Sequence, residues 1–252
     1  MWIRRIVLWG VIDHHALQNA TIVTDLPIYM DIRPWGSMSS IIAHSFFTLR
    51  RKPHKPTAGM LLSAILSDTL NLQGPTTTDW DRVIVSELVN FTGVTDVQAL
   101  ATQQFKAKSQ ELAGYTAMEL IHTDQKIFSF KTTHFEGSIG FAVIETTDDE
   151  VILRKSPELI VALAADKQAK KLSALFLAVV NIVQLRTHLL VMSEDERSLA
   201  FSAFPHGKML GKDGNHSCAM DIGKLVSRKK DFIPAITNAV KRGWVPASLP
   251  SQ

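Results

Sequence analysis

An aspartate and two histidines stand together near the start of the chain, as Asp13-His14-His15. They follow the stretch Ile6 to Ile12, which is apolar and rich in β-branched residues and therefore predicts a buried parallel strand. Parallel sheets of α/β proteins place their ligand sites at the carboxyl ends of strands. Adjacent side chains on extended backbone point in different directions, so one imidazole could ligate a metal ion while the other meets a substrate. On this spacing alone, histidines solvated in a loop are the alternative.

An isolated carboxylate, Asp68, stands at the end of another apolar stretch. The segment Thr57 to Leu66 is rich in alanine and leucine and predicts a buried helix. A charge at the end of a buried element is costly unless it has a partner. Asp68 therefore either serves a site or, as the plainer alternative, ends a helix or forms a turn.

Three cations, Arg228, Lys229 and Lys230, occur together near the carboxyl end of the chain. Arginine can hold phosphate oxygens through two parallel hydrogen bonds, and lysine supplies a point charge. A solvated basic patch is the alternative. Lys126, in the segment Asp124 to Phe128, taken by itself is an ordinary strand lysine.

The elements that must position these residues alternate between helices and strands. Helices are predicted where apolar residues recur at helical spacing and Ser, Pro or Gly marks an end, namely from Ser37 to Leu49, Thr57 to Leu66, Asp79 to Phe91 and Pro157 to Lys171. Strands are predicted at Lys126 to Lys131, Ile139 to Ile144, Ala174 to Val183 and His188 to Met192. The pattern predicts an α/β fold with domains over residues 1–108 and 116–252, joined by a linker at residues 109–115.

The composition limits the class of protein. Of the 252 residues 46% are hydrophobic and 20% are charged, which suffices for a sizeable core. The 27 basic and 24 acidic residues nearly balance, which argues against a general affinity for nucleic acid. No apolar run approaches the roughly 18 residues that a membrane span needs. The single Cys218 fits a reducing compartment, so a cytoplasmic protein without nucleic-acid or membrane partners is expected.

Five segments follow one another along the chain and carry most of the residues singled out above. They read VIDHH, PWGSMSSII, LLSAILSDTLNLQGPTTTDWD, DQKIF and SRKKDFIPAI, at residues 11–15, 34–42, 61–81, 124–128 and 227–236. In this order they resemble the manganese-dependent (family II) inorganic pyrophosphatases of the DHH phosphoesterase superfamily. The third and fifth segments are specific to that family, whereas the DHH triplet alone indicates only the superfamily. The resemblance covers nearly the whole chain from Val11 onward.

The resemblance implies a partial parallel-sheet DHH domain followed by a smaller mixed-sheet α/β domain, with the active site in the cleft between them. It also implies hydrolysis of pyrophosphate by a two-metal mechanism with two Mn²⁺ ions per site, Co²⁺ or Mg²⁺ being the alternative metals. By motif, His14 and Asp68 correspond to metal ligands, and His15 to a catalytic residue that faces the substrate phosphate. The residues that correspond to the family's pyrophosphate-binding set are His15, Lys126, Arg228 and Lys229.

The resemblance also points to a difference at the start of the chain. Family members carry a His-x-x-x-Asp-x-Asp segment and a further aspartate ahead of the DHH strand, whereas the twelve residues before Asp13 contain no His, Asp or Glu. We therefore expect residues 1–252 alone to bind manganese weakly and to show no pyrophosphatase activity above background at millimolar manganese. Fusion to the upstream segment of a close relative is expected to restore activity. An exposed edge of the shortened sheet could pair with a second copy, which makes a homodimer an expected partner. The alternative functions are an exopolyphosphatase or other DHH phosphodiesterase, and a catalytically inactive phosphate-binding protein.

Overall fold

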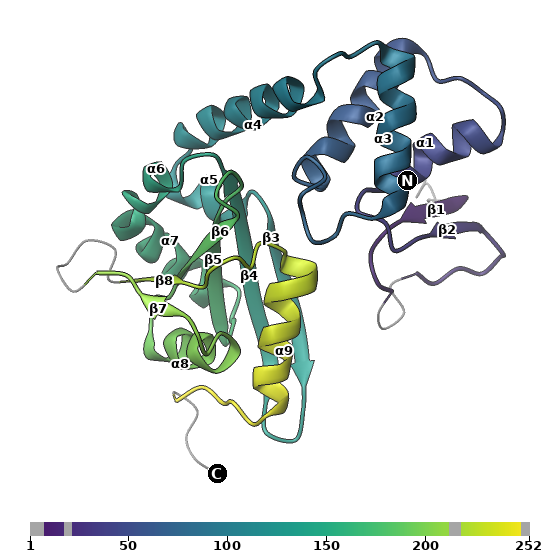
Figure 1. Cartoon of the computed structure of the whole chain (residues 1–252). Helices are drawn as coiled ribbons and strands as arrows, with labels where there is room; N and C mark the ends of the chain where they lie inside the picture. The colour runs from purple at the N-terminus through teal and green to yellow at the C-terminus, as the bar shows by residue number, and fades with distance from the viewer. Residues whose placement is uncertain (1–7, 18–21, 212–217, 248–252) are drawn as a thin grey trace, which may run out of the picture. The chain divides into compact units, whose positions relative to one another are not determined.

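The computed structural model describes residues 8–17, 22–211 and 218–247. The chain divides into two units, Met1–Gln104 and Phe105–Gln252, each with most of its contacts internal (Figure 1). We call them unit 1 and unit 2 and describe each by itself. Among the described residues, no helix is long and apolar enough to cross a membrane.

Unit 1 begins with a two-stranded parallel sheet. Strand β1 (Gly10–Asp13) pairs with β2 (Tyr29–Ile32), so that Asp13 lies opposite Ile32. The strand predicted at Ile6 to Ile12 is therefore shifted, because the observed strand begins at Gly10 and includes Asp13. Residues 6 and 7 lie outside the described part of the chain. The expectation that this strand is buried is wrong, because all four residues of β1 are partly exposed. The main contacts of β1 among the described elements are with β2 and one helix, which cannot cover all of its side chains.

Three helices complete the core of unit 1, as the sequence predicts. They are α1 (Met38–Thr48), α2 (Lys55–Asp68) and α3 (Asp79–Thr92), and they pack against one another. The N-cap of α1 is Ser37, and the left-handed Gly93 (φ 76°) ends α3, as the sequence predicts. The large apolar side chains that the three helices bury completely are Ile41, Leu62, Ile65, Leu66 and Leu88.

A long helix, α4 (Val97–Ala113), begins in unit 1 and crosses the boundary into unit 2. Residues 109–113, the greater part of the predicted linker, form the last turns of this helix. A polar stretch without Gly or Pro in its interior is compatible with a helix, which explains the difference. Whether residues 109–115 act as a linker stays a prediction.

Unit 2 is built on a six-stranded mixed sheet, which confirms the fold class predicted for the second half of the chain. The strand order is β3-β4-β5-β6-β8-β7, with β4 and β5 parallel and every other pair antiparallel. The strands are β3 (Gln125–Lys131), β4 (Glu136–Thr146), β5 (Ala174–Asn181), β6 (Arg186–Leu190), β7 (Lys208–Met209) and β8 (Ala219–Asp221). The strand predicted at His188 to Met192 thus lies two residues earlier in the chain.

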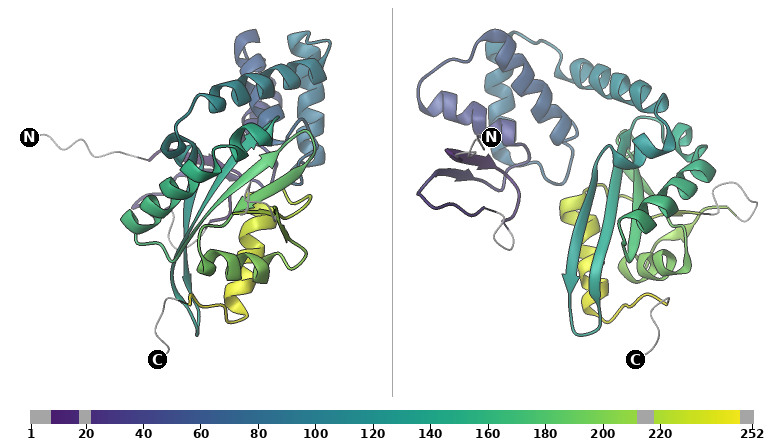
Figure 2. Two further views of the ribbon diagram at one scale, coloured as in Figure 1. Left: turned by 90° about the vertical axis from the view of Figure 1, so that its left-hand side faces the viewer. Right: turned by 180° about the vertical axis from the view of Figure 1, so that it is seen from behind.

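Helices cover both faces of this sheet (Figures 1 and 2). One face packs against α5 (Ala117–His122), α6 (Asp149–Leu153) and α7 (Ser156–Ala169), and the other against α8 (Glu194–Ala203) and α9 (Ile233–Lys241). All eight residues of β5 are buried, as a central strand between two helical layers requires. On the face of α9, the rings of Phe141 and Phe232 stack with centroids 5.2 Å apart.

Candidate functional site

The Asp13-His14-His15 turn follows directly from the end of β1. Nitrogen and oxygen atoms of the three side chains lie within 4.8 Å of one another, in the only such group of three or more that the described residues contain. Asp13 Oδ1 accepts hydrogen bonds from the backbone N–H groups of His14 (2.6 Å) and His15 (3.2 Å) and contacts His15 Nδ1 at 2.7 Å. The two imidazole rings stand edge to face, with centroids 4.4 Å apart. The aspartate therefore orients the ring of His15 and fixes the backbone of both histidines.

Asp13 is an ionised carboxylate in this arrangement. Partial burial raises its pKa, but the hydrogen bonds from His15 and from the two backbone N–H groups lower it more, so the pKa lies below its usual range. The contact between Asp13 Oδ1 and Nδ1 of His15 also fixes the orientation of that imidazole ring. Asp13 thus orients His15. The sequence pattern shows Asp13 only as a member of the triplet and does not indicate this role.

His14 has the geometry of a metal-ligating histidine. Its Nδ1 lies 3.0 Å from the carbonyl oxygen of Trp35, which can only accept, so Nδ1 carries the proton. In the neutral ring, Nε2 is then the nitrogen with the lone pair, and a backbone carbonyl on the other nitrogen is the common partner of ligating histidines. An imidazole combined with carboxylates suits a transition metal such as manganese. The donor types present therefore fit the metal that the sequence predicts.

Asp68 is the last residue of α2 and is exposed. The hydroxyl of Ser37 donates to Asp68 Oδ2 at 2.7 Å. Asp68 does not belong to the group formed by Asp13, His14 and His15. It is nevertheless linked to His14, because the two side chains contact opposite ends of the three-residue turn Trp35-Gly36-Ser37, whose ends lie at most roughly 7 Å apart.

The backbone immediately after Asp68 is strained. Leu70, Asn71 and Leu72 have φ angles of 49°, 53° and 64°, a left-handed conformation that costs non-glycine residues roughly 1–2 kcal/mol each. Thr69 holds this turn closed, since its carbonyl accepts from the N–H of Gly74 (2.7 Å) and its hydroxyl from the N–H of Leu72 (3.1 Å). Such strain tends to gather at functional sites. The sequence carries no glycine at these three positions and so gives no signal of it.

The predicted phosphate-binding cations lie in unit 2, and the structure brings two of them to one place. Arg228 donates from Nη1 to the carbonyl oxygen of Asp124 and from Nη2 to its carboxylate, both at 2.8 Å. Asp124 directly precedes β3, and Lys126 is the second residue of that strand. Arg228 therefore lies at the start of the strand that carries Lys126. Lys229 follows Arg228 in a short π-helix, η1 (Arg228–Phe232), and is exposed, as Lys126 is.

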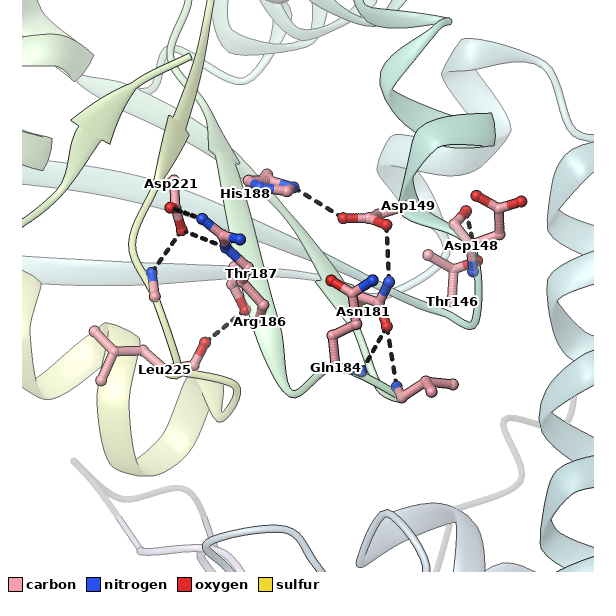
Figure 3. Close-up of polar contacts among 12 residues, drawn as sticks. Thr146, Asp148, Asp149, Asn181, Gln184, Arg186, Thr187, His188, Asp221 and Leu225 are labelled. Atoms are coloured by element: carbon pink, nitrogen blue, oxygen red, sulfur yellow. Dashed lines mark hydrogen bonds and ion pairs between the residues drawn. The ribbon is translucent and has the colours of Figure 1, made fainter.

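The segment that leads to Arg228 is held by strand β6, as Figure 3 shows. The hydroxyl of Thr187 donates to the carbonyl oxygen of Leu225 at 2.5 Å. Arg186 forms a two-point ion pair with Asp221, whose Oδ1 also accepts from the N–H of Gly223 at 2.9 Å. These contacts join β6 to the loop between β8 and η1, and so fix where the cationic helix begins.

A buried polar pair lies near the hairpin that joins β5 and β6 (Figure 3). His188 Nδ1 is 3.0 Å from Asp149 Oδ2, an ion-pair distance without the alignment of a hydrogen bond. Asn181, at the end of β5, donates to Asp149 Oδ1 at 2.8 Å. The contacts tie α6 to the end of β5 and to the middle of β6. These residues lie in none of the five segments that resemble the family.

Comparison with known protein families matches the second half of the chain. A model of the DHHA2 domain matches residues 102–239, which include all of β3 to β8 and most of α9. The match thus covers more than half of the chain and contains the three cations predicted to bind phosphate.

Comparison with individual proteins extends the similarity to most of the chain. A Deinococcus radiodurans protein described as a probable manganese-dependent inorganic pyrophosphatase is 34% identical over 226 residues, which is 90% of this chain and 69% of that protein. A Streptococcus suis protein with the same description is 31% identical over 239 residues, 94% of this chain and 71% of that one. A crystal structure from Methanococcus jannaschii, described as a candidate family II inorganic pyrophosphatase, aligns with a TM-score of 0.76 at 25% identity and covers 90% of this chain and 71% of its own.

Proposed function

The chain belongs to the manganese-dependent inorganic pyrophosphatases, and from this premise we propose that it hydrolyses pyrophosphate to two phosphates with two Mn²⁺ ions per site. The observation that carries the proposal for the described residues is the Asp13-His14-His15 turn, with His14 Nδ1 held by a backbone carbonyl and His15 held by a carboxylate. One imidazole is thereby oriented to ligate a metal ion and the other to face the substrate phosphate.

In this proposal His14 Nε2 and the Asp68 carboxylate are metal ligands. When bound, the metal ions supply a hydroxide nucleophile near neutral pH and polarise phosphoryl oxygens. The Trp35 carbonyl and the Ser37 hydroxyl fix the directions of the two ligands before any ion arrives. Such partners of metal ligands typically change metal affinity 10–100-fold when they are removed.

His15 is the proposed catalytic residue. Its Nδ1 faces Asp13, so its Nε2 can point toward a substrate phosphate. Asp13 holds the ring in this orientation, as the aspartate does in other carboxylate–histidine pairs. The side chain of His15 is half exposed, which leaves it accessible to a small anion.

Arg228, Lys126 and Lys229 are the proposed substrate-binding cations. Arg228 uses one N–H of each Nη group on Asp124, and a guanidinium has five such donors. The contact with Asp124 therefore orients the guanidinium without exhausting its capacity to bind phosphate. Cations placed in advance where negative charge develops stabilise the transition state of phosphoryl transfer.

Phosphate release tests the proposal. Fused to the His-x-x-x-Asp-x-Asp segment of a relative and assayed with a series of Mn²⁺ concentrations, the protein is expected to release phosphate from pyrophosphate faster than from long-chain polyphosphate. The Asp68→Asn variant, purified identically, controls for a contaminating host pyrophosphatase and should show background rates. Preference for polyphosphate would instead favour an exopolyphosphatase. Tight binding of imidodiphosphate with no turnover of pyrophosphate would favour an inactive phosphate-binding protein.

A further inference from the structure

The turn Trp35-Gly36-Ser37 contacts both proposed metal ligands of unit 1, and one buried carboxylate holds the turn. Asp81, in the first turn of α3, is fully buried. Its Oδ2 accepts from the N–H of Gly36 at 2.9 Å, and its Oδ1 from the N–H of Ser37 at 3.3 Å. The hydroxyl of Ser40, in α1, also donates to Oδ1 at 2.6 Å.

Asp81 also belongs to the cap of its own helix. The N–H and the hydroxyl of Thr78 donate to Asp81 Oδ2 at 2.8 and 2.6 Å. The carboxylate thus accepts five hydrogen bonds, all from neutral groups, and joins the start of α1 to the start of α3. Burial raises its pKa, but the hydrogen bonds from Ser40, Thr78 and Gly36 lower it more, so the pKa lies below its usual range.

Gly36 shows how closely this turn approaches the carboxylate. A Cβ atom at Gly36 would lie 2.8 Å from Asp81 Oδ2 and 2.9 Å from Cγ2 of Thr69. No side chain fits there without moving the turn away from the carboxylate. Thr69 is the residue directly after Asp68. The turn therefore packs between the N-terminal cap of α3 and the C-terminal end of α2.

From these contacts we infer that Asp81 is a positioning residue for the metal centre. It fixes the Trp35-Gly36-Ser37 turn, whose carbonyl at Trp35 orients His14 and whose hydroxyl at Ser37 orients Asp68. A residue that served only to cap α3 would need the contacts with Thr78 alone. The additional bonds to Gly36, Ser37 and Ser40 give Asp81 control over both ligands at once. The inference rests on the proposed function, since it assumes that His14 and Asp68 bind metal.

Manganese affinity, measured by titration calorimetry and by the electron paramagnetic resonance signal of unbound Mn²⁺, tests the inference. Asp81→Asn and Ser37→Ala should each weaken binding 10–100-fold. Ser39→Ala is the matched control for Ser37, because it removes a neighbouring hydroxyl with no hydrogen bond to a ligand. Asp96→Asn is the control for Asp81, because Asp96 also caps a helix of unit 1, through the N–H of Ala99, without contacting the turn. Both controls should stay within about twofold of the unchanged protein.

A second measurement needs no metal. The ¹⁵N chemical shifts of the His14 ring should show the Nδ1–H tautomer in the unchanged protein and in both controls, and a mixture of tautomers in Asp81→Asn. If Asp81→Asn lowers the melting temperature but leaves manganese affinity and the His14 tautomer unchanged, Asp81 only caps α3 and the inference is wrong. If Asp81→Asn does not fold, unchanged manganese affinity in Ser37→Ala overturns the inference.

The His14→Gln variant separates this inference from the proposed function. If His14→Gln leaves manganese affinity unchanged, the ligand assignment fails and the inference fails with it. If His14→Gln weakens manganese binding while Ser37→Ala and Asp81→Asn do not, the proposed function stands and the inference alone is overturned.

Discussion

Units 1 and 2 hold their candidate functional residues in different ways. In unit 1, β1 is partly exposed along its whole length, and the residues that follow it are oriented by polar contacts with a turn and a buried carboxylate. In unit 2, β5 is buried along its whole length between two layers of helices. The cations of unit 2 lie at the edge of that apolar core. Among them, Arg228 is oriented by its ion pair with Asp124.

The difference predicts different responses to substitution. A site oriented by hydrogen bonds loses its geometry when one donor or acceptor is removed, because the groups left behind are buried and unsatisfied. A site mounted on a packed sheet keeps its geometry when a surface charge is removed and loses only the function of that charge. Metal affinity should therefore be the sensitive quantity in unit 1, and catalytic rate at unchanged stability the sensitive quantity in unit 2.

The largest effect is expected for Arg228→Ala in the protein fused to the upstream segment of a relative. Removing one charged stabilising donor should lower kcat about 10²–10³-fold, or about 2.7–4 kcal/mol, while manganese affinity hardly changes. Steady-state kinetics with pyrophosphate and calorimetric titration with Mn²⁺ measure the two quantities. Arg197→Ala, which removes an exposed arginine paired at 3.9 Å with Glu194, is the control and should change neither. Near-normal hydrolysis by Arg228→Ala would indicate that the basic segment is a solvated surface patch and does not bind the substrate.

The two histidines of unit 1 should separate. His14→Gln removes an imidazole ligand and should weaken manganese binding about 10–100-fold together with activity. His15→Gln should lower kcat with a smaller change in manganese affinity. His54→Gln, an exposed histidine with no side-chain bond at the start of α2, serves as the control. Equal loss of manganese affinity in the His14 and His15 variants would contradict the division of roles.

Acid stability should distinguish the buried carboxylates of the two units. Because the folded-state pKa of Asp81 is lowered, its contribution to the free energy of unfolding is fully present above about pH 4, the pKa of an unfolded aspartate, and is lost as the pH falls through the folded-state pKa. Roughly between pH 6 and pH 3, the range in which an aspartate becomes protonated, denaturant titrations should therefore show a fall in the free energy of unfolding. This fall should be smaller for Asp81→Asn than for the unchanged protein.

Asp166 in unit 2 sharpens this contrast. Burial raises its pKa, and hydrogen bonds from Lys170, Gln125 and His122 lower it more, so its folded-state pKa is also below the usual range. Its partner Lys170, at 2.9 Å, is charged, whereas the five donors to Asp81 are neutral. Added salt should therefore weaken the acid dependence contributed by Asp166 more than that contributed by Asp81. The two contributions are measured by comparing Asp166→Asn and Asp81→Asn with the unchanged protein. If added salt weakens both contributions equally, the expected difference between charged and neutral partners is wrong.

The smallest effect should be the same in both units. Arg50 and Lys171 are exposed, and both have a φ angle of 52°. Arg50 follows the end of α1 and Lys171 follows the end of α7. After each of them, the backbone N–H of the next residue donates to a carbonyl oxygen of the preceding helix. This position favours glycine, so Arg50→Gly and Lys171→Gly should each raise the free energy of unfolding by about 1 kcal/mol. Thermal denaturation measures the change. A loss of stability at either position would mean that its side chain makes contacts that offset the strain.

The sequence by itself predicted the elements whose signals are local. Helix starts and ends at Ser37, Asp79 and Gly93 follow from hydrogen bonds within one turn of chain, which a short stretch of sequence specifies. Strands β3, β4 and β5 follow from apolar and β-branched runs. The order of five segments identified the family, which the comparisons confirm. The roles of the individual site residues stay predictions.

Only the tertiary structure decided how those residues are held. The bond between Arg228 and Asp124 joins positions 104 residues apart, and β8 pairs between β6 and β7 although it follows both in the chain. Neither arrangement leaves a periodic signal in the sequence. The left-handed turn after Asp68 is formed by residues other than glycine. Two of the five hydrogen bonds to Asp81 come from the backbone N–H groups of Gly36 and Ser37, which precede it by 45 and 44 residues. Every residue carries such backbone groups, so which ones meet a carboxylate is set by the packing of α1, α2 and α3 and not by residue type.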